Sequence, residues 1–226
     1  MTTHISLNST NRINYAGTSP ANCTINLNRR IFAKCAELSF FMTPNSFYNI
    51  TGTNNTFLLD GAPQTLDSGC YTLSQLFTEI LTLLPAGSTM LYNDVLNKIE
   101  ITTLVNHTLD FSVSGIYIVL GFLPQLYPAA TIFLSTNPPK IYQSIVHIET
   151  SLGTNMVNDQ GYHSSFIVPI NVNKSEMIQF YNRSQFSSRP KVQEAEIKSV
   201  QIILKDEYGN IMQGAGDWTM IIAVAE

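Results

Sequence analysis

The residue types that most often do chemistry in proteins are scattered along this sequence of 226 residues. None of its four histidines belongs to an H-x-x-x-H or C-x-x-C pattern, which would indicate a metal site; they are His4, His107, His147 and His163. His147 alternates within an expected strand, so we interpret it as an exposed or hydrogen-bonded strand residue. A Ser–His–Asp triad stays open because its members meet only in space, but the G-x-S-x-G elbow that often carries the serine is absent.

Acidic residues near the C-terminus are the remaining candidates for a site. Asp206, Glu207 and Asp217 could meet across an expected turn and hold a cation, although solvated turn acids are the interpretation we favour. The glycines around Gly214-Ala215-Gly216 do not form a phosphate-binding pattern. The sequence does not single out a pair of carboxylates that could cleave a glycosidic bond. We therefore predict no catalytic, cofactor-binding or metal-binding residues, no cofactor and no enzyme activity, with a β-sandwich hydrolase as the least favoured alternative.

The three cysteines, Cys23, Cys35 and Cys70, are odd in number and have no metal-type spacing. Because cysteine is often fully buried as a small hydrophobic residue, we predict buried free thiols rather than a disulfide.

One amphipathic helix is expected, near residues 72–84. Thr72 and Gln75 form a capping box, and Pro85 and Gly87 stop the helix. Apolar residues then recur at the spacing of one helical face: Leu73, Leu76, Phe77, Ile80, Leu81 and Leu84. A single such helix in a β-rich chain has to cover a sheet or close one end of a sandwich, so we predict that this face packs on the sandwich.

The rest of the chain is interpreted as strands and loops. Alternating patterns predict strands, of which the clearest are His4–Leu7, Cys23–Leu27, Ile31–Met42, Thr56–Leu59, Lys98–Val105, Ile141–Glu149, Phe166–Val172, Glu176–Tyr181, Glu196–Lys205 and Trp218–Ala225. Ile116–Phe122 is continuously apolar, the prolines of Pro124–Lys140 indicate a long connection, and Pro169 indicates an edge strand or a bulge. Polar loops are expected over 153–163 and 185–190. The pattern predicts a mainly β protein, a β-sandwich with jelly-roll wiring, and one domain over residues 1–226.

The composition favours a protein whose surface is covered by neighbours. Charged residues are only 12% of the chain, about half the usual ~25%. The net charge is −4 and the only basic cluster is Arg29, Arg30 and Lys34, which excludes electrostatic binding of nucleic acid as a main activity. No signal peptide is expected in the first fifteen residues, and no run reaches the ~20 apolar residues of a membrane span. Tyrosines are numerous and fit an interface or the edge of a core equally well.

Several short motifs occur in an order that resembles the penton-type and minor capsid proteins of virophages, Polinton-like viruses and related double-jelly-roll DNA viruses. They are PNSFYNIT at Pro44–Thr51, NNTF at Asn54–Phe57, G-x-Y-x-x-x-x-L at Gly69–Leu76, LGF at Leu120–Phe122 and I-x-I-x-L-x-D-x-x-G, placed over Ile197–Asp206 and Gly209.

This resemblance implies a jelly-roll virion protein that closes the fivefold vertices of an icosahedral shell. It implies a homopentamer that contacts the capsomers of the major capsid protein. No added outer domain is evident from the sequence, so a receptor-binding role is not expected from the resemblance. The alternative from another functional class is a carbohydrate-binding or fibre-type β-sandwich with an exposed aromatic platform.

Overall fold

The computed structural model describes residues 2–152, 156–157, 163–182 and 191–225. Contacts within the chain form two compact units: unit 1 consists of Met1–Phe47 and Gln143–Glu226, and unit 2 of Tyr48–Tyr142. The prediction of one domain did not anticipate this division, because neither composition nor a linker marks the boundaries at Phe47 and Tyr142. The loops expected over 153–163 and 185–190 lie almost entirely outside the described residues.

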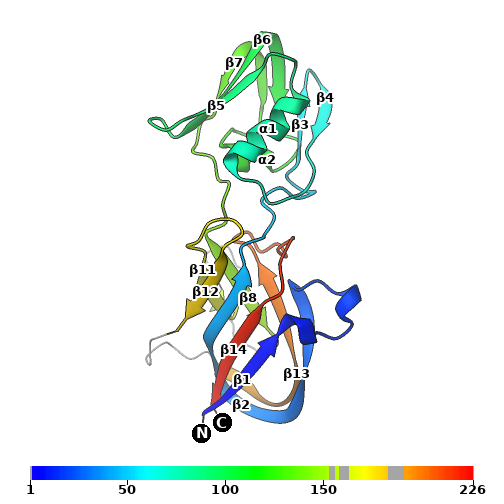
Figure 1. Ribbon diagram of the computed structural model, residues 1–226, viewed down its shortest axis with the longest axis vertical. Coiled ribbons are helices and arrows are strands. Elements are labelled where there is room, and N and C mark those ends of the chain that lie inside the picture. The colour runs from blue at the N-terminus through cyan, green and yellow to red at the C-terminus, as the bar shows by residue number, and fades with distance from the viewer. Residues whose placement is uncertain (1, 153–155, 158–162, 183–190, 226) are drawn as a thin grey trace. The chain divides into compact units, whose positions relative to one another are not determined.

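Unit 1 is built from antiparallel strands that pair in the order β1-β14-β2-β13-β8-β11, with β12 also paired to β2. Their bounds are β1 Thr2–Asn8, β2 Asn22–Pro44, β8 Ile145–Thr150, β11 Phe166–Pro169, β12 Met177–Tyr181, β13 Lys191–Lys205 and β14 Thr219–Ala225. The short strands β9 (Met156–Val157) and β10 (His163–Ser164) pair with each other. Figure 1 shows β1 and β14 side by side, with both chain termini at the same end of this unit.

Strand β2 serves both layers of unit 1 because it bends. Two strands were predicted here, and the structure joins them into one strand of 23 residues. Ile31 pairs with Ile197 and Asn26 pairs with Ser199, so the four residues between Asn26 and Ile31 oppose a single residue of β13. Such an irregularity bends a strand and turns a corner in a sandwich. Residues 31–35 of β2 still pair with β13; from Cys35 onward β2 pairs with β14, and from Phe40 onward also with β12.

Counting the two halves of β2 separately gives eight strands in two layers of four, β1-β14-β2-β12 and β2-β13-β8-β11. In chain order these layers read 1-8-3-6 and 2-7-4-5, which is the wiring of a jelly roll. The predicted fold class is therefore confirmed. Pro169 lies in β11, which pairs only with β8, so its expected place in an edge strand is also confirmed.

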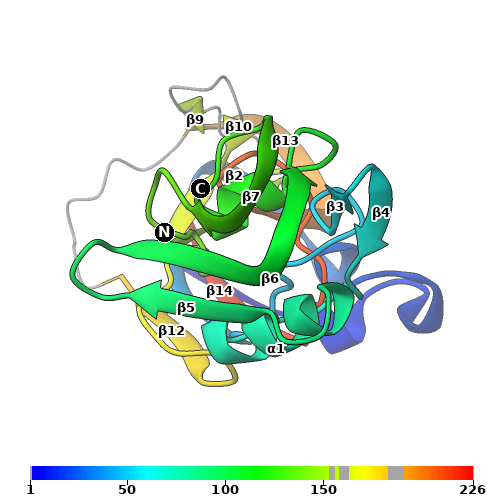
Figure 2. The same cartoon turned by 90° about the horizontal axis from the view of Figure 1, so that it is seen from above.

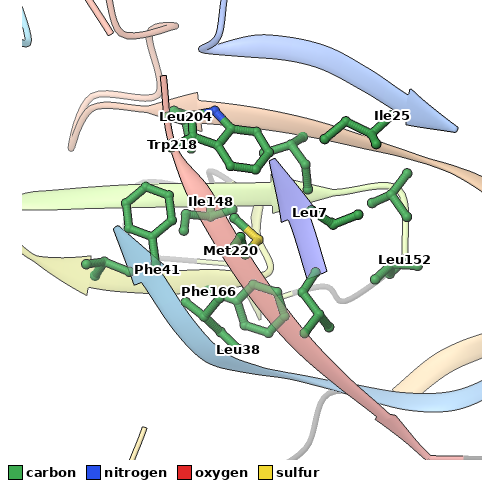
Figure 3. Close-up of a cluster of buried hydrophobic side chains, with 14 of the residues drawn as sticks. Leu7, Ile25, Leu38, Phe41, Ile148, Leu152, Phe166, Leu204, Trp218 and Met220 are labelled. Carbon is green, nitrogen blue, oxygen red and sulfur yellow. The ribbon is translucent and has the colours of Figure 1, made fainter. Parts of the chain in front are cut away.

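One buried cluster fills the space between the two layers. Figure 3 shows Phe41, Met220 and Ile148, from three different strands, pointing toward one another and toward Trp218, which directly precedes β14. Trp218 is 1% exposed, and its indole N–H donates to the carbonyl of Pro20 at 2.7 Å, which satisfies the one polar group of the ring. Residues from both layers contribute, as a sandwich core requires.

Unit 2 is a five-stranded antiparallel sheet with two α-helices. Its elements are β3 Thr56–Leu59, β4 Ala62–Thr65, α1 Leu73–Leu83, β5 Thr89–Asn93, β6 Lys98–Asp110, α2 Ile116–Leu120 and β7 Leu126–Leu134. The strand order is β4-β3-β6-β5, with β7 paired to β6. Figure 2 shows the long strand β6 bending sharply beside β5 and β7. Register shifts between Thr102 and Leu109 accompany this bend.

The predicted helix is confirmed, including its capping box: the Thr72 side chain accepts from the Gln75 N–H and the Gln75 side chain accepts from the Thr72 N–H. Its apolar face does not pack on the sandwich, however. Leu76 and Ile80 are buried in a cluster made entirely from unit 2, together with Met90, Ile99 and Phe133. The helix thus belongs to the second core.

Two other sequence interpretations of this unit are wrong. The apolar run at Ile116 forms the short helix α2, which ends at Gly121 in a left-handed conformation (φ 77°). A side chain there would meet the carbonyl of Asn137, so the position requires glycine. The supposed connection after Pro124 contains the nine-residue strand β7. Apolar residues lie on both faces of β7, since Phe133 is buried while Ile132 and Leu134 are exposed, so the sequence shows no alternation of apolar and polar residues. Among the described residues, no helix is long and apolar enough to span a membrane.

Candidate interaction surfaces

The histidine and acidic residues that the sequence analysis considered as site candidates do not form one site in the described part of the chain. No group of three or more histidine, cysteine, aspartate or glutamate side chains is placed to hold a metal ion within the described part of the chain. His147 is buried in β8, and its Nε2 has no hydrogen-bond partner among the described residues, which differs from the exposed or satisfied residue expected. His107 lies in the other unit, where its Nδ1 is 2.6 Å from Oδ2 of Asp60.

Asp60 is fixed in the turn between β3 and β4. It has a left-handed backbone (φ 49°) followed by Gly61 (φ 80°), as a two-residue hairpin turn requires. Its carboxylate accepts from the N–H of Thr108 at 2.8 Å. This bond, and the bond to His107, hold the pKa of Asp60 below its ordinary value. The pair joins the hairpin to β6, and no nucleophile completes it in the described residues.

The three acids near the C-terminus are not assembled around a cation. Asp206 closes its own turn by accepting from the N–H groups of Tyr208 and Asn210, each at 2.8 Å. Asp217 instead pairs with the buried guanidinium of Arg12, at 2.8 Å between Nη1 and Oδ1. These two carboxylates are therefore used in local structure.

Asp217 is the centre of a network that fastens the loop after β1 to the start of β14. Its carboxylate accepts from Ser9 Oγ at 2.8 Å, from Arg12 and from the Tyr15 hydroxyl at 3.1 Å. The Arg12 guanidinium lies 3.9 Å from the centre of the Tyr15 ring. Burial raises the pKa of Asp217, but the bonds from Ser9, Arg12 and Tyr15 outweigh that effect and place it below its ordinary value.

Cys23 is a free thiol and is buried, in agreement with the prediction, whereas Cys70 is only half-buried. Burial raises the pKa of the Cys23 thiol, which makes it unreactive. The side chain of Cys35 lies outside the described residues.

The two outer faces of the jelly roll differ in chemistry. On the layer β1-β14-β2-β12, the register places a row of apolar residues away from the core, on the opposite side from Phe41 and Met220: Phe40, Met42, Met177, Tyr181 and Ile221. The rings of Phe40 and Tyr181 are 4.9 Å apart, and Tyr181 is 57% exposed. Tyrosine, phenylalanine and methionine are enriched in the cores of protein interfaces. We call these five residues the aromatic face.

The outer face of the other layer is polar. Lys205 of β13 forms an ion pair with Glu149 of β8, and Gln201 donates to Asn22 of β2. His147 lies beside Lys205 in register on this same face. Removing water from a surface with paired charges costs more free energy than removing water from an apolar surface. Of the two outer faces, the aromatic face is therefore the better candidate for a contact with a neighbour.

Unit 2 has an apolar surface of its own, on the side of its sheet that faces away from α1 and the buried cluster. Leu91 of β5 and Leu134 of β7 flank Glu100 of β6 in a single cross-strand row. Ile132 occupies the next row, and all three aliphatic side chains are exposed. Contiguous exposed apolar patches of this kind mark interaction sites.

Sequence reasoning missed both surfaces. Phe40 and Met42 lie in a strand in which both faces are apolar, so alternation could not show which residues point outward. Of the tyrosines considered for an interface, Tyr142 and Tyr181 are exposed, Tyr162 lies outside the described residues, and the others are half-buried: Tyr71, Tyr92, Tyr117, Tyr127 and Tyr208. A tyrosine count therefore gives little information about the surface.

No protein-family model matches the sequence, and no curated protein matches it. The structure is similar to that of the mavirus penton protein, with a TM-score of 0.52, 8% sequence identity, and coverage of 98% of this chain and 97% of that chain. It also aligns with a chain in a structure of the Sputnik virophage, with a TM-score of 0.43, 12% identity, and coverage of 99% of this chain and 97% of that chain. The fold of this chain is thus similar to that of a virophage penton protein over nearly its whole length, as the sequence motifs suggested.

Proposed function

We propose that this chain is a structural protein of a virion, a penton or minor capsid subunit that closes the fivefold vertices of an icosahedral shell. The observation that carries the proposal is the end-to-end likeness to the mavirus penton protein, which includes 97% of that protein's chain. A jelly roll with a second unit inserted between its third and fourth strands is a specific arrangement. It supports a role in assembly, and no enzyme activity is proposed.

In this function the subunit forms a homopentamer and contacts the capsomers of the major capsid protein around it. A ring of identical subunits needs a heterologous interface, in which two different patches of the same chain meet. The aromatic face is one such patch, because it combines two methionines and two aromatic rings on the outer side of one layer of the jelly roll. The low charge of the whole chain, with 12% charged residues, also favours a contact of this apolar kind.

The mass of the purified chain in solution tests this proposal. Multi-angle light scattering should give a mass of about five subunits or a multiple of five, since a fivefold vertex requires a cyclic pentamer. Tyr181→Asp should reduce that mass to well below five subunits, because it places an unpaired charge in the aromatic face. Gln201→Asp, on the polar outer face, is the matched control and should leave the mass unchanged. A strictly monomeric protein, both when purified alone and when extracted from virions, would contradict the proposal.

A further inference from the structure

The exposed side of the sheet in unit 2 is a candidate contact that the proposed function does not use. Four aliphatic side chains lie on it: Leu91, Leu104, Ile132 and Leu134, with exposures of 61%, 74%, 58% and 41%. The cross-strand rows Leu91–Glu100–Leu134 and Thr89–Thr102–Ile132 show that the side chains of three neighbouring strands share this face. Leu104 lies on β6 two residues beyond Thr102. We call this surface the unit 2 face.

Two more apolar residues lie at the other end of the unit 2 face, at the tip of the hairpin between β5 and β6. Val95 is 92% exposed and Leu96 is 54% exposed. The tip is held in shape by the Asn93 side chain, which accepts from the N–H groups of both residues at 3.0 Å. A rigid turn that exposes two aliphatic side chains to water costs free energy unless another surface covers them.

Between these two apolar ends lie Lys98 and Glu100, two charged residues of β6, and a third charged residue, Asp94, lies at the hairpin tip beside Val95. Lys98 and Glu100 are two positions apart on β6, with the buried Ile99 between them. Residues at i and i+2 of a strand point to the same side and are separated by roughly 7 Å. Glu100 accepts a long hydrogen bond from Thr102 at 3.4 Å, and no ion pair is formed by Lys98 within the described residues.

This arrangement is complementary to itself when one copy is reversed. If two β6 strands are stacked face to face and antiparallel about Ile99, each Lys98 opposes the Glu100 of the other copy. The same operation places the hairpin tip of each copy, with Val95 and Leu96, over the end of the other face, with Leu104 and Ile132. Charges then meet opposite charges, and apolar ends meet apolar ends.

We propose that two copies of this chain associate through the unit 2 face, with a twofold axis at Ile99 and two reciprocal Lys98–Glu100 pairs. The contact is isologous, because the same patch is used by both copies. It does not depend on the proposed capsid function. A twofold contact cannot lie between neighbours of a fivefold ring, so it joins copies from different rings, or free subunits, while the aromatic face serves the ring.

Charge reversal tests the pairing directly. Lys98→Glu puts two Glu–Glu pairs into the contact, and Glu100→Lys puts two Lys–Lys pairs there. Each single variant should weaken the association at least about tenfold, because like charges placed opposite each other repel. The double variant K98E/E100K restores the opposition of charges and should associate within about threefold of the unaltered chain. Sedimentation velocity on the full chain at low salt measures these affinities.

The mass ratio separates this contact from ring formation. The unaltered chain should reach at least twice the mass of Lys98→Glu, whatever the mass of that variant. If Lys98→Glu sediments as a pentamer the ring proposal stands, and if it sediments as a monomer the ring proposal fails while the unit 2 contact remains.

Mixing the two single variants gives a second readout. One copy then carries only acidic side chains at these two positions and the other copy only basic ones, so the mixture should form mixed complexes that neither variant forms alone. Leu104→Ser should weaken the association without changing its dependence on these charges, and the melting temperature of each variant checks that it is folded. Equal masses for the unaltered chain and Lys98→Glu, or a double variant no better than the singles, would overturn the proposal. Capture of another protein by this face in place of a second copy would also overturn it.

Discussion

The side-chain amide of Asn49 donates to the carbonyl of Ile141 at 2.9 Å, across 92 residues of sequence. The same Nδ2 donates to the carbonyl of Tyr71 at 2.7 Å, and the Asn49 Oδ1 accepts from the Tyr71 N–H at 2.8 Å. Asn49 is the second residue of unit 2 and Ile141 is the last but one. One side chain therefore fastens the start of unit 2 to its end and to the segment that leads into α1.

Removing this clamp should destabilise unit 2. Asn49→Ala deletes three hydrogen bonds and leaves half-buried backbone groups unpaired, so we expect a loss of about 2–4 kcal/mol in the free energy of unfolding. Urea denaturation followed by far-UV circular dichroism measures it. Asn106→Ala is the control, because Asn106 is exposed and forms no side-chain hydrogen bond within the described structure. Equal midpoints for the two variants would show that the clamp has no energetic role.

The two separate cores should respond separately to mutation. Leu76 is fully buried in the cluster of unit 2. Leu76→Asp should cost more than about 4 kcal/mol there, because it buries an unpaired charge. The only tryptophan, Trp218, lies in the core of unit 1, so its fluorescence should still report a native transition. Ser74→Asp, on the exposed side of the same helix, should change neither signal.

If the Trp218 fluorescence and the helix signal of Leu76→Asp both change at the same denaturant concentration, the two units unfold as one.

The capping box of α1 should make a smaller but measurable contribution to the free energy of unfolding. Thr72→Ala removes the side-chain oxygen that accepts from the Gln75 N–H at 3.3 Å, and should cost about 1 kcal/mol. Thr78→Ala, in the exposed middle of the helix, should be neutral or slightly stabilising since alanine is the better helix former. Both are compared by thermal melting, and a larger loss for Thr78→Ala would be inconsistent with the capping role.

The Arg12–Asp217 pair should make unit 1 sensitive to acid. The pKa of Asp217 is below its ordinary value of 3.8 in the folded protein. A lowered pKa means that this carboxylate stabilises the fold above its ordinary pKa and that the stabilisation is lost as the pH falls through the lower, folded value. Asp217→Asn should therefore be less stable than the unaltered chain at about pH 6, and the difference should shrink toward about pH 2. Trp218 fluorescence during unfolding reports it, and a difference that does not vary with pH would contradict the assignment.

Several elements could be predicted from the sequence because their signals are local. The capping box and 3.6-residue period of α1 depend on neighbouring residues, and so does the turn at Asp206–Gly209. The predicted bounds of β3 are those of the structure. The asparagines in the motifs that suggested the family also have a local explanation: Asn54 and Asn55 bond to the backbones of Asn49 and Leu66.

The remaining features depend on contacts that are distant in sequence. Unit 2 begins within the loop after β2, and the bond from Asn49 to Ile141 joins its start to its end across 92 residues. The apolar run at Ile116 forms a helix whose residues Ile116, Val119 and Leu120 are buried in the cluster of unit 2, with partners that are distant in sequence. The partner of Asp217 is Arg12, 205 residues away, so spacing along the chain suggested the wrong neighbours for this carboxylate.

Electron cryo-microscopy of the particles that contain this chain can show whether it occupies the fivefold vertices of a capsid, as we propose. Five copies of the jelly roll of unit 1 should fit the density around each fivefold axis, with the aromatic face against a neighbouring subunit. Density at those axes that fits a different fold, with this chain elsewhere in the particle or absent from it, would contradict the account.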